Sequence, residues 1–426
     1  MITDMDYRRF TTRSLKDPRV LRILASAIEA VDPYQAVQNY LPAVEGRVFG
    51  LGIGKAALPM MDALVERIPL AGGLAVTKFA SGEASRPYTV IEGGHPIPDE
   101  RSFDAGQRVL EFVSSLHEDD TLICLISGGG SALVTAPDVP LEDLMTLTSL
   151  LLSSGARIDE INTLRRQLDR IKGGGLARAT EAKIISLILS DVIGNPLEAI
   201  ASGPTVPDPT TKQDALNILK KYNLKKQAPD SILFSLEKEN LISQPGEQAL
   251  RFQNIQNRIV GDNRLAARAA LEQAEREGFD AEILSNELQG EAREVGLELA
   301  RRLRVDNVRR THPFCLIAGG ETTVTIQGNG KGGRNQELAL AAVSELAEVA
   351  DVMLITLATD GDDGPTDAAG AVVTGESAQR AQSLGLDVSD HLSRNDAYPF
   401  FEKLGDLLKT GPTGTNVNDL TFLFAI

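Results

Sequence analysis

The sequence predicts an α/β fold with two domains that face one cleft, and three observations support this prediction. Residues 122–133 read LICLISGGGSAL, an apolar run followed by three glycines, a serine and helix-forming residues. This order is typical of a strand, a tight turn and a helix, and such a turn lets the backbone approach an anion closely. Residues 315–322, CLIAGGET, repeat the pattern far along the chain. The length of 426 residues also exceeds what one ordinary core accommodates.

Composition favours an α/β enzyme over a nucleic-acid or membrane protein. The chain is 42% hydrophobic, has 38 glycines, lacks tryptophan and is only 4% aromatic, which argues against stacking on nucleic-acid bases. Its net charge of −16 disfavours non-specific binding to nucleic acid or anionic lipid, so an anionic substrate needs local basic residues.

The two cysteines and the N-terminal residues indicate a cytoplasmic protein. Cys124 and Cys315 lie in apolar runs, where a small buried side chain is expected rather than a disulfide or a nucleophile. The first residues contain no apolar signal segment, and no apolar run approaches the roughly 18 residues of a membrane span. We therefore expect a cytoplasmic protein without membrane contact.

Helices are expected in the first 40 residues, with Asp17 and Pro18 as a start signal. Residues 47–57, RVFGLGIGKAA, then predict a strand, a glycine turn and a helix. The dinucleotide fingerprint is imperfect here in either frame. Counted from Gly50, the third glycine position holds Lys55; counted from Gly52, it holds Ala57, which is permitted, but the next strand ends at Lys78 without an acidic residue for a ribose. Lys55 at the helix start is a candidate phosphate ligand, and its alternative is a solvated surface lysine.

Between this motif and the central turn, the sequence predicts a strand at 73–77 and a helix at 102–114. His95 lies between two glycines and a proline, and hence in a loop. A loop histidine is a candidate site residue, although no partner for it can be identified from the sequence.

Two helices, 141–152 and 160–171, follow the central turn. Lys172 precedes three glycines and is a second candidate anion ligand, although the helix dipole alone also favours a lysine there. A strand from 183 to 190 leads to Asp191 and Asn195. Ligands of open parallel sheets bind at such strand ends, so Asp191 is a candidate metal ligand or base, with a turn or helix cap as the alternative.

Residues 211–245 are rich in Lys, Gln, Asn and Glu, unlike the preceding residues. We interpret them as a helical excursion and linker, with a domain boundary near Gln244. A strand at 257–264, a helix at 265–277 and a strand at 281–285 then predict a second doubly wound sheet. The predicted domains are therefore 1–245 and 246–426.

The second glycine turn is expected to continue into a strand at 322–327, a hairpin at 329–330 and a helix opening at Arg334. A cation at a helix N-terminus opposes the dipole, so Arg334 is a functional candidate, with a solvated arginine as the alternative. After a strand at 352–358, Asp360, Asp362, Asp363 and Asp367 form either a site for a hydrated divalent cation or a solvated turn. A glycine-rich loop and an apolar strand, 420–426, end the chain.

Eight motifs in one order resemble the glycerate 2-kinase family, whose C-terminal part is the MOFRL domain. They begin at residues 52, 92, 127, 171, 190, 319, 330 and 360: GIGKA, EGGHPIPD, SGGGSAL, IKGGGLA, SDVIGNP, GGETTV, GKGGRNQE and DGDDGPTDAAG. The resemblance covers nearly the whole chain. It implies two Rossmann-like layered sheets with flanking helices, and an active site in the interdomain cleft. It further implies transfer of the ATP γ-phosphate to the 2-hydroxyl of D-glycerate, with Mg²⁺, to give 2-phosphoglycerate.

With this resemblance, the candidates take specific roles. Lys55 and Arg334 are implied to face each other across the cleft as the main catalytic residues, and Asp191 is a further catalytic candidate. Asp191 and Asp360 are the predicted metal ligands, while His95, Ser131 and Arg334 are predicted to bind substrate. The predicted cofactor-binding residues are Gly128, Gly129, Gly130, Ser131, Lys172, Asn195, Gly319, Gly320 and Glu321.

Two other functions stay open at this stage. Members of the family are also labelled hydroxypyruvate reductases, which would require an NAD(P)H site, and the imperfect fingerprint at 50–57 offers no convincing one. A non-catalytic sugar-phosphate sensor would also suit the glycine turn at 127–131. The expected partners are a small-molecule substrate and a nucleotide, and the chain is expected to be a monomer or homodimer.

Overall fold

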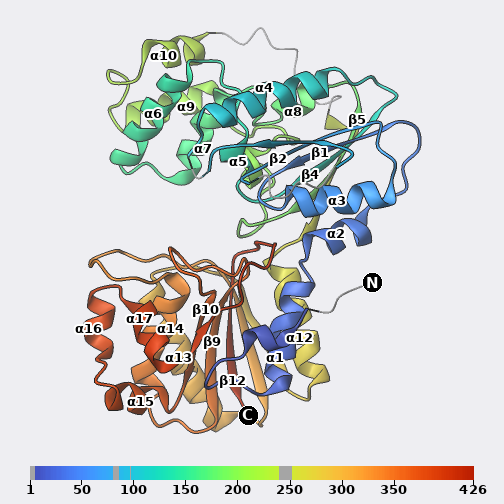
Figure 1. Cartoon of the computed structure of the whole chain (residues 1–426). Helices are drawn as coiled ribbons and strands as arrows, with labels where there is room; N and C mark the ends of the chain where they lie inside the picture. The colour runs from blue at the N-terminus through green and yellow to red at the C-terminus, as the bar shows by residue number, and fades with distance from the viewer. Residues whose placement is uncertain (1–4, 80–85, 96, 239–251) are drawn as a thin grey trace. The chain divides into compact units, whose positions relative to one another are not determined.

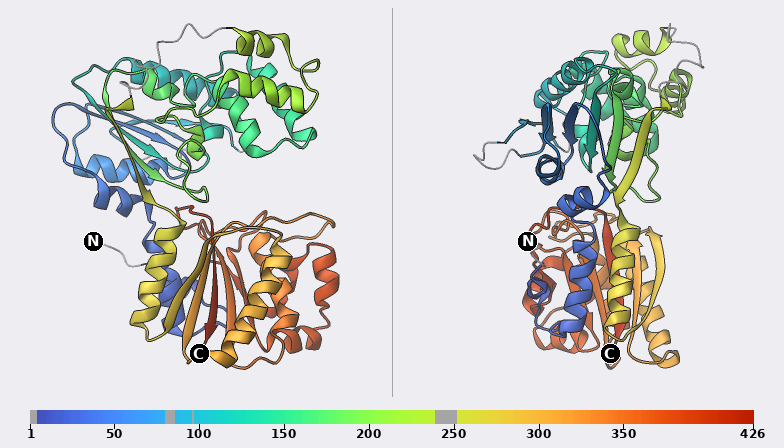
Figure 2. Two further views of the ribbon diagram at one scale, coloured as in Figure 1. Left: turned by 180° about the vertical axis from the view of Figure 1, so that it is seen from behind. Right: turned by 90° about the vertical axis from the view of Figure 1, so that its right-hand side faces the viewer.

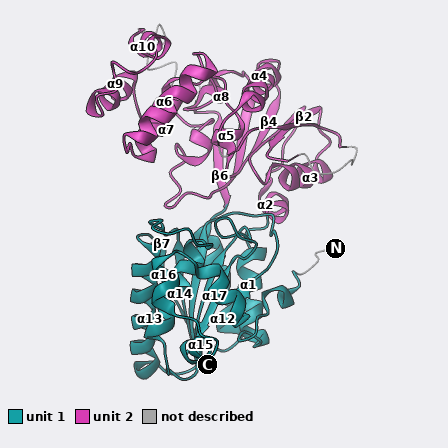
Figure 3. Cartoon of the chain, turned by 60° about the vertical axis from the view of Figure 1, so that its left-hand side comes forward, with its two compact units in different colours: residues 1–32, 261–426 teal, residues 33–260 magenta. Residues whose placement is uncertain are grey.

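The computed structural model describes residues 5–79, 86–95, 97–238 and 252–426, which form two compact units (Figure 3). Unit 1 comprises Met1–Asp32 with Gly261–Ile426, and unit 2 comprises Pro33–Val260. The units differ from the expected division in that the first helix packs with the C-terminal part of the chain. Arg22 forms an ion pair of 2.6 Å with Glu277, and the Thr415 hydroxyl donates to the Val31 carbonyl at 2.6 Å. The expected boundary near Gln244 lies outside the described residues.

Unit 2 is built on a six-stranded sheet in the order β3-β2-β1-β4-β5-β6. The pairs β1–β2, β1–β4, β2–β3 and β4–β5 are parallel, so the carboxyl ends of these strands meet at one edge. The strand order reverses between β1 and β4. The strands are β1 Val48–Ile53, β2 Gly72–Thr77, β3 Thr89–Glu92, β4 Thr121–Ile126, β5 Lys183–Leu189 and β6 Ile255–Gly261.

Helices cover both faces of this sheet (Figure 1). Strand β1 presents Leu51 to a core shared with α4, and its alternate residue Gly52 faces α3. A Cβ on Gly52 would come within 2.8 Å of the Met61 side chain, so the glycine lets α3 approach the sheet closely. The helices here are α2 Pro33–Tyr40, α3 Ala57–Arg67, α4 Glu100–Ser114, α5 Gly130–Leu133, α8 Gly175–Arg178 and the 3₁₀ turn η2 Ile200–Ser202.

A separate helical layer extends unit 2 (Figure 2). Leu147, Leu164, Leu219 and Ile232, one from each of its four helices, are buried together in one apolar cluster. The helices expected within 211–245 are confirmed for the described residues, 211–238. These residues belong to a packed layer, so the expectation of a linker there is corrected. The helices are α6 Leu141–Ser153, α7 Ile158–Gln167, α9 Lys212–Lys221 and α10 Asp230–Glu237.

Unit 1 contains a second six-stranded sheet in the order β11-β10-β9-β12-β8-β7. The expectation of a doubly wound parallel sheet is corrected, because β12 lies antiparallel between β8 and β9, and β10 is antiparallel to β9. Only β7–β8 is parallel among the described pairs. The strands are β7 Asp280–Leu288, β8 Phe314–Gly320, β9 Val352–Ala358, β10 Gly370–Thr374, β11 Leu407–Leu408 and β12 Asp419–Ala425.

Helices α1 and α12 pack together on one face of this sheet, and α13 and α14 pack together on the other (Figures 1 and 2). The expected strand at 322–327 and hairpin at 329–330 are absent; this described segment is a loop with one bridge, Glu291 to Thr323. The helices are η1 Tyr7–Phe10, α1 Pro18–Glu29, α12 Asn263–Arg276, α13 Ala292–Arg309, α14 Arg334–Glu345, α15 Ser377–Ser383, α16 Val388–Ser393 and α17 Ala397–Leu404.

Both cysteines are free and buried, as predicted. Burial raises the pKa of Cys124 to about 12 and that of Cys315 well above its ordinary value, so neither is an activated thiol. Among the helices that the structure describes, none is long and apolar enough to span a bilayer.

A buried ion pair fixes the connection after α7. The Lys172 ammonium donates to Asp169 at 2.7 Å and to the Val134 carbonyl at 3.0 Å, and the two charged side chains are 3% and 1% exposed. Asp169 also accepts from the Thr135 hydroxyl at 2.6 Å and from the Ile171 N–H at 2.8 Å. Because the Asp169 side chain takes these backbone bonds, α7 ends earlier than the expected residue 171. Although burial raises the pKa of Asp169, Lys172 outweighs it and holds the pKa below its ordinary value.

Substitution Lys172→Met should destabilise unit 2 by about 3–5 kcal/mol, because it leaves Asp169 as an uncompensated buried charge. The measurement is the midpoint of urea denaturation followed by circular dichroism, since the chain lacks tryptophan. The double substitution Asp169→Asn with Lys172→Met should recover part of this loss. The control is exposed Lys226→Met, expected within about 0.5 kcal/mol of the parent; an equal effect in both single variants would contradict a structural ion pair.

Candidate active site

The glycine turn after β4 has uncommitted backbone N–H groups. In the part of the chain that the structure describes, the amides of Gly128, Gly129, Gly130 and Ser131 have no hydrogen-bond acceptor. Gly129 has φ +84°, a left-handed conformation that a glycine adopts without strain. Successive N–H groups at the end of a central strand can bind an anion. The turn therefore has the donors that the sequence prediction requires.

The turn after β1 differs, because its N–H groups are already bonded. The Lys55 N–H donates to the Gly128 carbonyl at 2.9 Å, and the Ala56 N–H donates to the Ser127 hydroxyl at 3.0 Å. The Ala57 N–H donates to the Gly54 carbonyl at 3.2 Å. In a dinucleotide site the N–H groups at this position face a pyrophosphate. Here they support the β4 turn instead.

Basic side chains surround Gly129. A Cβ added to this glycine would come within 3.2 Å of both Lys55 Cγ and His95 Cδ2. The Lys55 side chain is exposed, and no hydrogen bond or ion pair joins its ammonium group to a described residue. Lys78, at the end of β2, is close enough to act on the charge of His95. The glycine turn therefore lies in a local positive field in a protein of net charge −16.

His95 is neutral at physiological pH. Burial lowers its pKa to about 4, and the charges of Lys55 and Lys78 act in the same direction. The buried Nδ1 atom has no hydrogen-bond partner among the described residues. A neutral imidazole is a weak base at this pKa but can still hydrogen-bond a substrate hydroxyl.

Asp191 follows β5 and lies against the glycine turn. A Cβ on Gly128 would be 2.1 Å from Asp191 Oδ2, so the absence of a side chain at Gly128 makes room for this carboxylate. Burial raises the pKa of Asp191, while Lys55 acts in the opposite direction. The structure thus brings Lys55, His95 and Asp191 together around one turn, from three separate loops.

The loop around Ser202 is strained and supports the glycine turn. Ala201 and Ser202 have φ of 49° and 61°, values that L-residues rarely adopt. The Ser202 hydroxyl lies 2.7 Å from that of Ser131, and the Ser202 carbonyl accepts from the Gly173 N–H at 2.9 Å. Asn195 begins this loop with φ 57°. Backbone strain held by such contacts is typical of functional sites.

Lys172 occupies a different position from the one its predicted role requires. Its ammonium group is bonded to Asp169 and Val134 and is buried, so it supports the site through the fold. Burial lowers its pKa more than Asp169 raises it. Direct cofactor binding by Lys172 stays a prediction that this geometry does not favour.

In unit 1, Arg334 is the first residue of α14 and is held by two carboxylates. Its Nη2 donates to Asp419 at 3.1 Å, with a second bond from Nε to the other Asp419 oxygen, and its Nη1 lies 2.9 Å from Glu321. Burial lowers the pKa of Arg334, but Asp419 and Glu321 outweigh it and hold the pKa above its ordinary value. These carboxylates explain how a cation is tolerated where the helix dipole disfavours one.

The second glycine turn packs more tightly than the first. A Cβ on Gly319 would be 1.8 Å from Asn263 Oδ1, and one on Gly320 would be 2.2 Å from the Leu288 carbonyl. Asn263 in turn donates to the carbonyls of Val417 and Asp419, at 3.0 and 2.9 Å. The geometry shows Glu321 as a partner of Arg334, whereas cofactor binding by these residues stays a prediction.

The four aspartates after β9 have separate environments. Asp363 is buried and accepts from the N–H groups of Asn335 and Gln336, at 3.2 and 2.9 Å, at the start of α14. Burial raises its pKa to about 7 against these bonds. Asp367 accepts from the Tyr398 hydroxyl at 2.6 Å, Asp362 is exposed, and Asp360 is half-buried.

No group of three or more His, Cys, Asp or Glu residues is arranged to hold a metal in the described part of the chain. This does not conflict with a magnesium ion bound together with a nucleotide, which needs only one or two carboxylates besides phosphates and water. Asp191 beside the free N–H groups fits such a role.

Sequence reasoning missed Lys78 and Asp419 as candidate site residues. The sequence shows Lys78 at the end of a strand, but there it indicates only that an acidic residue for a ribose is absent. Asp419 carries no motif signal, because its pairing with Arg334 joins residues 85 positions apart.

Comparison with known proteins gives two family matches. Residues 19–237 match a family described as a domain of unknown function, DUF4147, and residues 314–419 match the MOFRL family. A curated relative from Pyrococcus horikoshii, named glycerate 2-kinase, is 41% identical over 94% of this chain and 95% of its own. Another, from Agrobacterium vitis and named putative hydroxypyruvate reductase, is 39% identical over 97% of this chain and 95% of its own.

A solved structure extends this likeness to the fold. The crystal structure of glycerate kinase from Thermotoga maritima matches with a TM-score of 0.89 and 41% identity, covering 96% of this chain and 99% of that one. Similarity of this extent covers both units and confirms the resemblance found in the motifs. The chain belongs to the glycerate 2-kinase family.

Proposed function

We propose that this chain is an ATP-dependent glycerate 2-kinase, which transfers the γ-phosphate of ATP to the 2-hydroxyl of D-glycerate. The observation that carries the proposal is the β4 turn, where four N–H groups and the nearby ammonium of Lys55 have no partner among the described residues. Relatives named glycerate 2-kinase support the same activity. Phosphoryl transfer depends mainly on positioning and charge neutralisation, and these groups can supply both.

The fold of unit 2 supports this location of the phosphates. Its strand order 3-2-1-4-5-6 and the parallel pairing of β1 to β5 support a Rossmann-like sheet, and such a sheet binds ligands where the strand order reverses. The turns after β1 and β4, which flank that reversal, carry Lys55 and the free N–H groups. We therefore assign the transferred phosphoryl group to the Gly128–Ser131 turn.

Each nearby side chain has a physical role in this assignment. Lys55 neutralises phosphoryl charge, and neutral His95 hydrogen-bonds a hydroxyl of the acceptor. Asp191 would hold Mg²⁺, which supplies charge neutralisation on the phosphate oxygens. In the alternative role of a base, without the ion bound to it, the raised pKa of Asp191 suits acceptance of the 2-hydroxyl proton. Arg334 acts on the same transition state, with Glu321 and Asp419 fixing its orientation. Location of the reaction in an interdomain cleft stays a prediction.

Two alternatives are less well supported. A hydroxypyruvate reductase, the name of one relative, needs a nicotinamide site, but the β1 turn has its N–H groups occupied and β2 is followed by Lys78 rather than an acid. A sugar-phosphate sensor would use the same β4 turn but would not require Arg334 and Asp191 to affect turnover.

The first test separates these functions. The purified chain with D-glycerate and MgATP should form ADP and 2-phosphoglycerate, measured by coupled assay and by mass spectrometry. It should not oxidise NADH or NADPH with hydroxypyruvate. Nicotinamide turnover without ATP use would establish the reductase, and sugar-phosphate binding with neither activity would establish the sensor.

Substitutions Lys55→Ala and Arg334→Ala should each lower kcat by roughly 10²- to 10⁴-fold, since each removes a positioned charge that stabilises the transition state. The double variant should lose less than the product of the two, because both residues act on one step. The matched controls are exposed Lys226→Ala and Arg157→Ala. A normal kcat with a raised KM in either site variant would make that residue a binding group only.

Asn substitution of Asp191 or Asp360 should raise the Mg²⁺ concentration that gives half-maximal rate, if at least one of these carboxylates holds the ion directly or through water. Asp362→Asn, in the same loop as Asp360 but exposed, is the control. Titration of initial rate against Mg²⁺ at fixed ATP is the measurement. Unchanged metal dependence in both variants would leave these aspartates as turn residues.

A further inference from the structure

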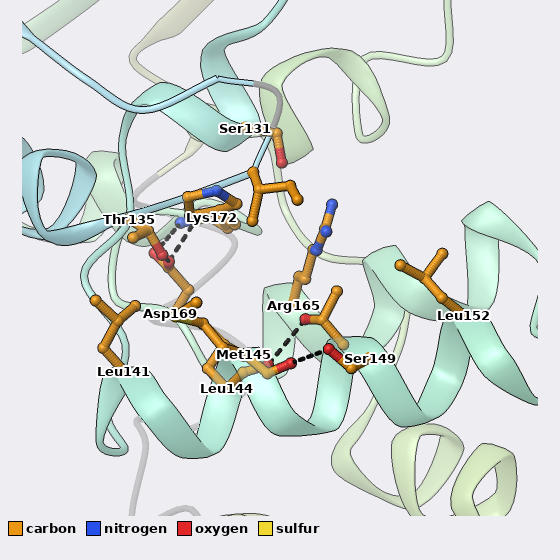
Figure 4. A pocket seen from close by; sticks show the side chains of 13 residues that line it. Ser131, Thr135, Leu141, Leu144, Met145, Ser149, Leu152, Arg165, Asp169 and Lys172 are labelled. Atoms are coloured by element: carbon orange, nitrogen blue, oxygen red, sulfur yellow. Dashed lines mark hydrogen bonds and ion pairs between the residues drawn. The ribbon is translucent and has the colours of Figure 1, made fainter.

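Unit 2 contains a pocket beside the glycine turn that the roles above do not use. It has a volume of about 290 Å³, near the lower end of the roughly 300–1,000 Å³ typical of small-molecule sites. It lies between α6, α7 and the residues around the glycine turn (Figure 4). Ser131 lines the pocket and also ends the turn. The pocket and the proposed phosphate site are therefore continuous.

One wall of the pocket is apolar and comes from α6. Leu141, Leu144, Met145 and Leu152 line it, and Met145 and Leu152 are 44% and 63% exposed. Large apolar side chains exposed together on one helix, around a cavity, indicate a binding surface. The wall suits a flat, apolar ligand surface.

Arg165 on α7 points into the pocket (Figure 4). It has no hydrogen bond or ion pair with any described residue, whereas its neighbour Arg166 is bonded to Asp208 at 2.9 Å. The carboxylate that lines the same pocket, Asp169, is already bonded to Lys172 and Thr135. Burial lowers the pKa of Arg165, so placing its charge there has a cost that no anion among the described residues offsets.

The other polar groups of the pocket are mostly occupied. The Thr148 hydroxyl donates to the Leu144 carbonyl at 2.8 Å, and the Ser149 hydroxyl donates to the Met145 carbonyl at 3.0 Å. Arg165 is thus the main uncommitted donor among the described lining residues. D-Glycerate is polar on every side and would lose more hydrogen bonds to water than this pocket returns. A ligand with an apolar ring and one phosphate fits better.

We propose that this pocket binds the nucleotide, with its base against the apolar wall of α6 and a phosphate on Arg165. Arginine binds phosphate oxygens bidentately, which suits the phosphate nearest the ribose. From there the remaining phosphates pass Ser131 and reach the N–H groups of Gly128–Gly130. This inference rests on the proposed kinase function. It adds the binding site of the nucleotide and the residue that binds its phosphate, Arg165.

The test measures nucleotide binding separately from turnover. Isothermal titration with MgADP should give a Kd about 10- to 100-fold higher for Arg165→Met than for the parent, as expected for loss of a charged hydrogen-bond pair. The KM for ATP should rise similarly, with kcat and the KM for D-glycerate within about threefold. The matched control is Arg157→Met, because the Arg157 side chain is exposed and is paired with the neighbouring Asp159. Circular dichroism checks that each variant is folded.

A second variant tests the apolar wall. Met145→Glu places a charge at an exposed position of α6 and should weaken MgADP binding at least tenfold, while binding of inorganic tripolyphosphate changes less because it has no base. Unchanged MgADP affinity in both variants, or a raised KM for D-glycerate alone, overturns the inference. Turnover of D-glycerate with unaffected nucleotide binding would refute this site and keep the kinase. Arg165-dependent MgADP binding without turnover would refute the kinase and keep the site.

Discussion

The proposed site depends on the contact between two backbone turns at the centre of the unit 2 sheet. The Lys55 N–H donates to the Gly128 carbonyl, and the Ala56 N–H donates to the Ser127 hydroxyl. A Cβ on Gly54 would lie 2.2 Å from the Ser127 hydroxyl oxygen, so only a glycine permits this approach. The contact has two consequences at once. It occupies the N–H groups of the β1 turn. It also holds the backbone of Lys55 beside the β4 turn, whose N–H groups have no acceptor among the described residues.

Charge is arranged in opposite ways in the two units. Around the β4 turn, Lys55 and Lys78 are cations with few protein partners, and His95 is kept neutral by burial and by these cations. In unit 1, Arg334 is surrounded by Glu321, Asp419 and the more distant Asp363. A local excess of positive charge attracts phosphate groups. An arginine that is paired with carboxylates instead contributes the orientation of its hydrogen bonds, since its planar guanidinium group is fixed before any ligand binds. The two predicted catalytic residues therefore differ before any ligand binds: Lys55 has few protein partners, whereas Arg334 is held in place by carboxylates.

Much of the fold could be predicted from the sequence, because apolar runs and glycine turns are local signals. The strands around Leu51 and Leu125, the helix start at Asp17 and the helix opening at Arg334 all follow from them. The antiparallel position of β12 could not be predicted, since strand direction depends on pairing between residues far apart in the chain. The packing of residues 211–238 was missed for a related reason. Their polar composition describes one face of α9 and α10, and the buried face consists of only a few residues, such as Leu219 and Ile232.

Contacts between residues far apart in the chain also limit how much of the candidate site could be predicted. The sequence identified Lys55, His95 and Asp191 singly, and their convergence follows from parallel strands that end at one edge. Motif similarity was less informative where packing differs. Residues 124–131 and 315–322 are alike in sequence, yet Gly128 is adjacent to Asp191 with free N–H groups, whereas Gly319 and Gly320 pack against Asn263 and Leu288. The glycines of the first turn make room for the Asp191 carboxylate and leave N–H groups without an acceptor among the described residues. The glycines of the second turn let Asn263 and Leu288 approach the backbone closely. Asn263 bonds to the Asp419 carbonyl, and the Asp419 side chain orients Arg334. One short sequence pattern thus leaves free N–H groups among the described residues in one unit and permits close packing in the other, and the residues that pack against each turn decide which.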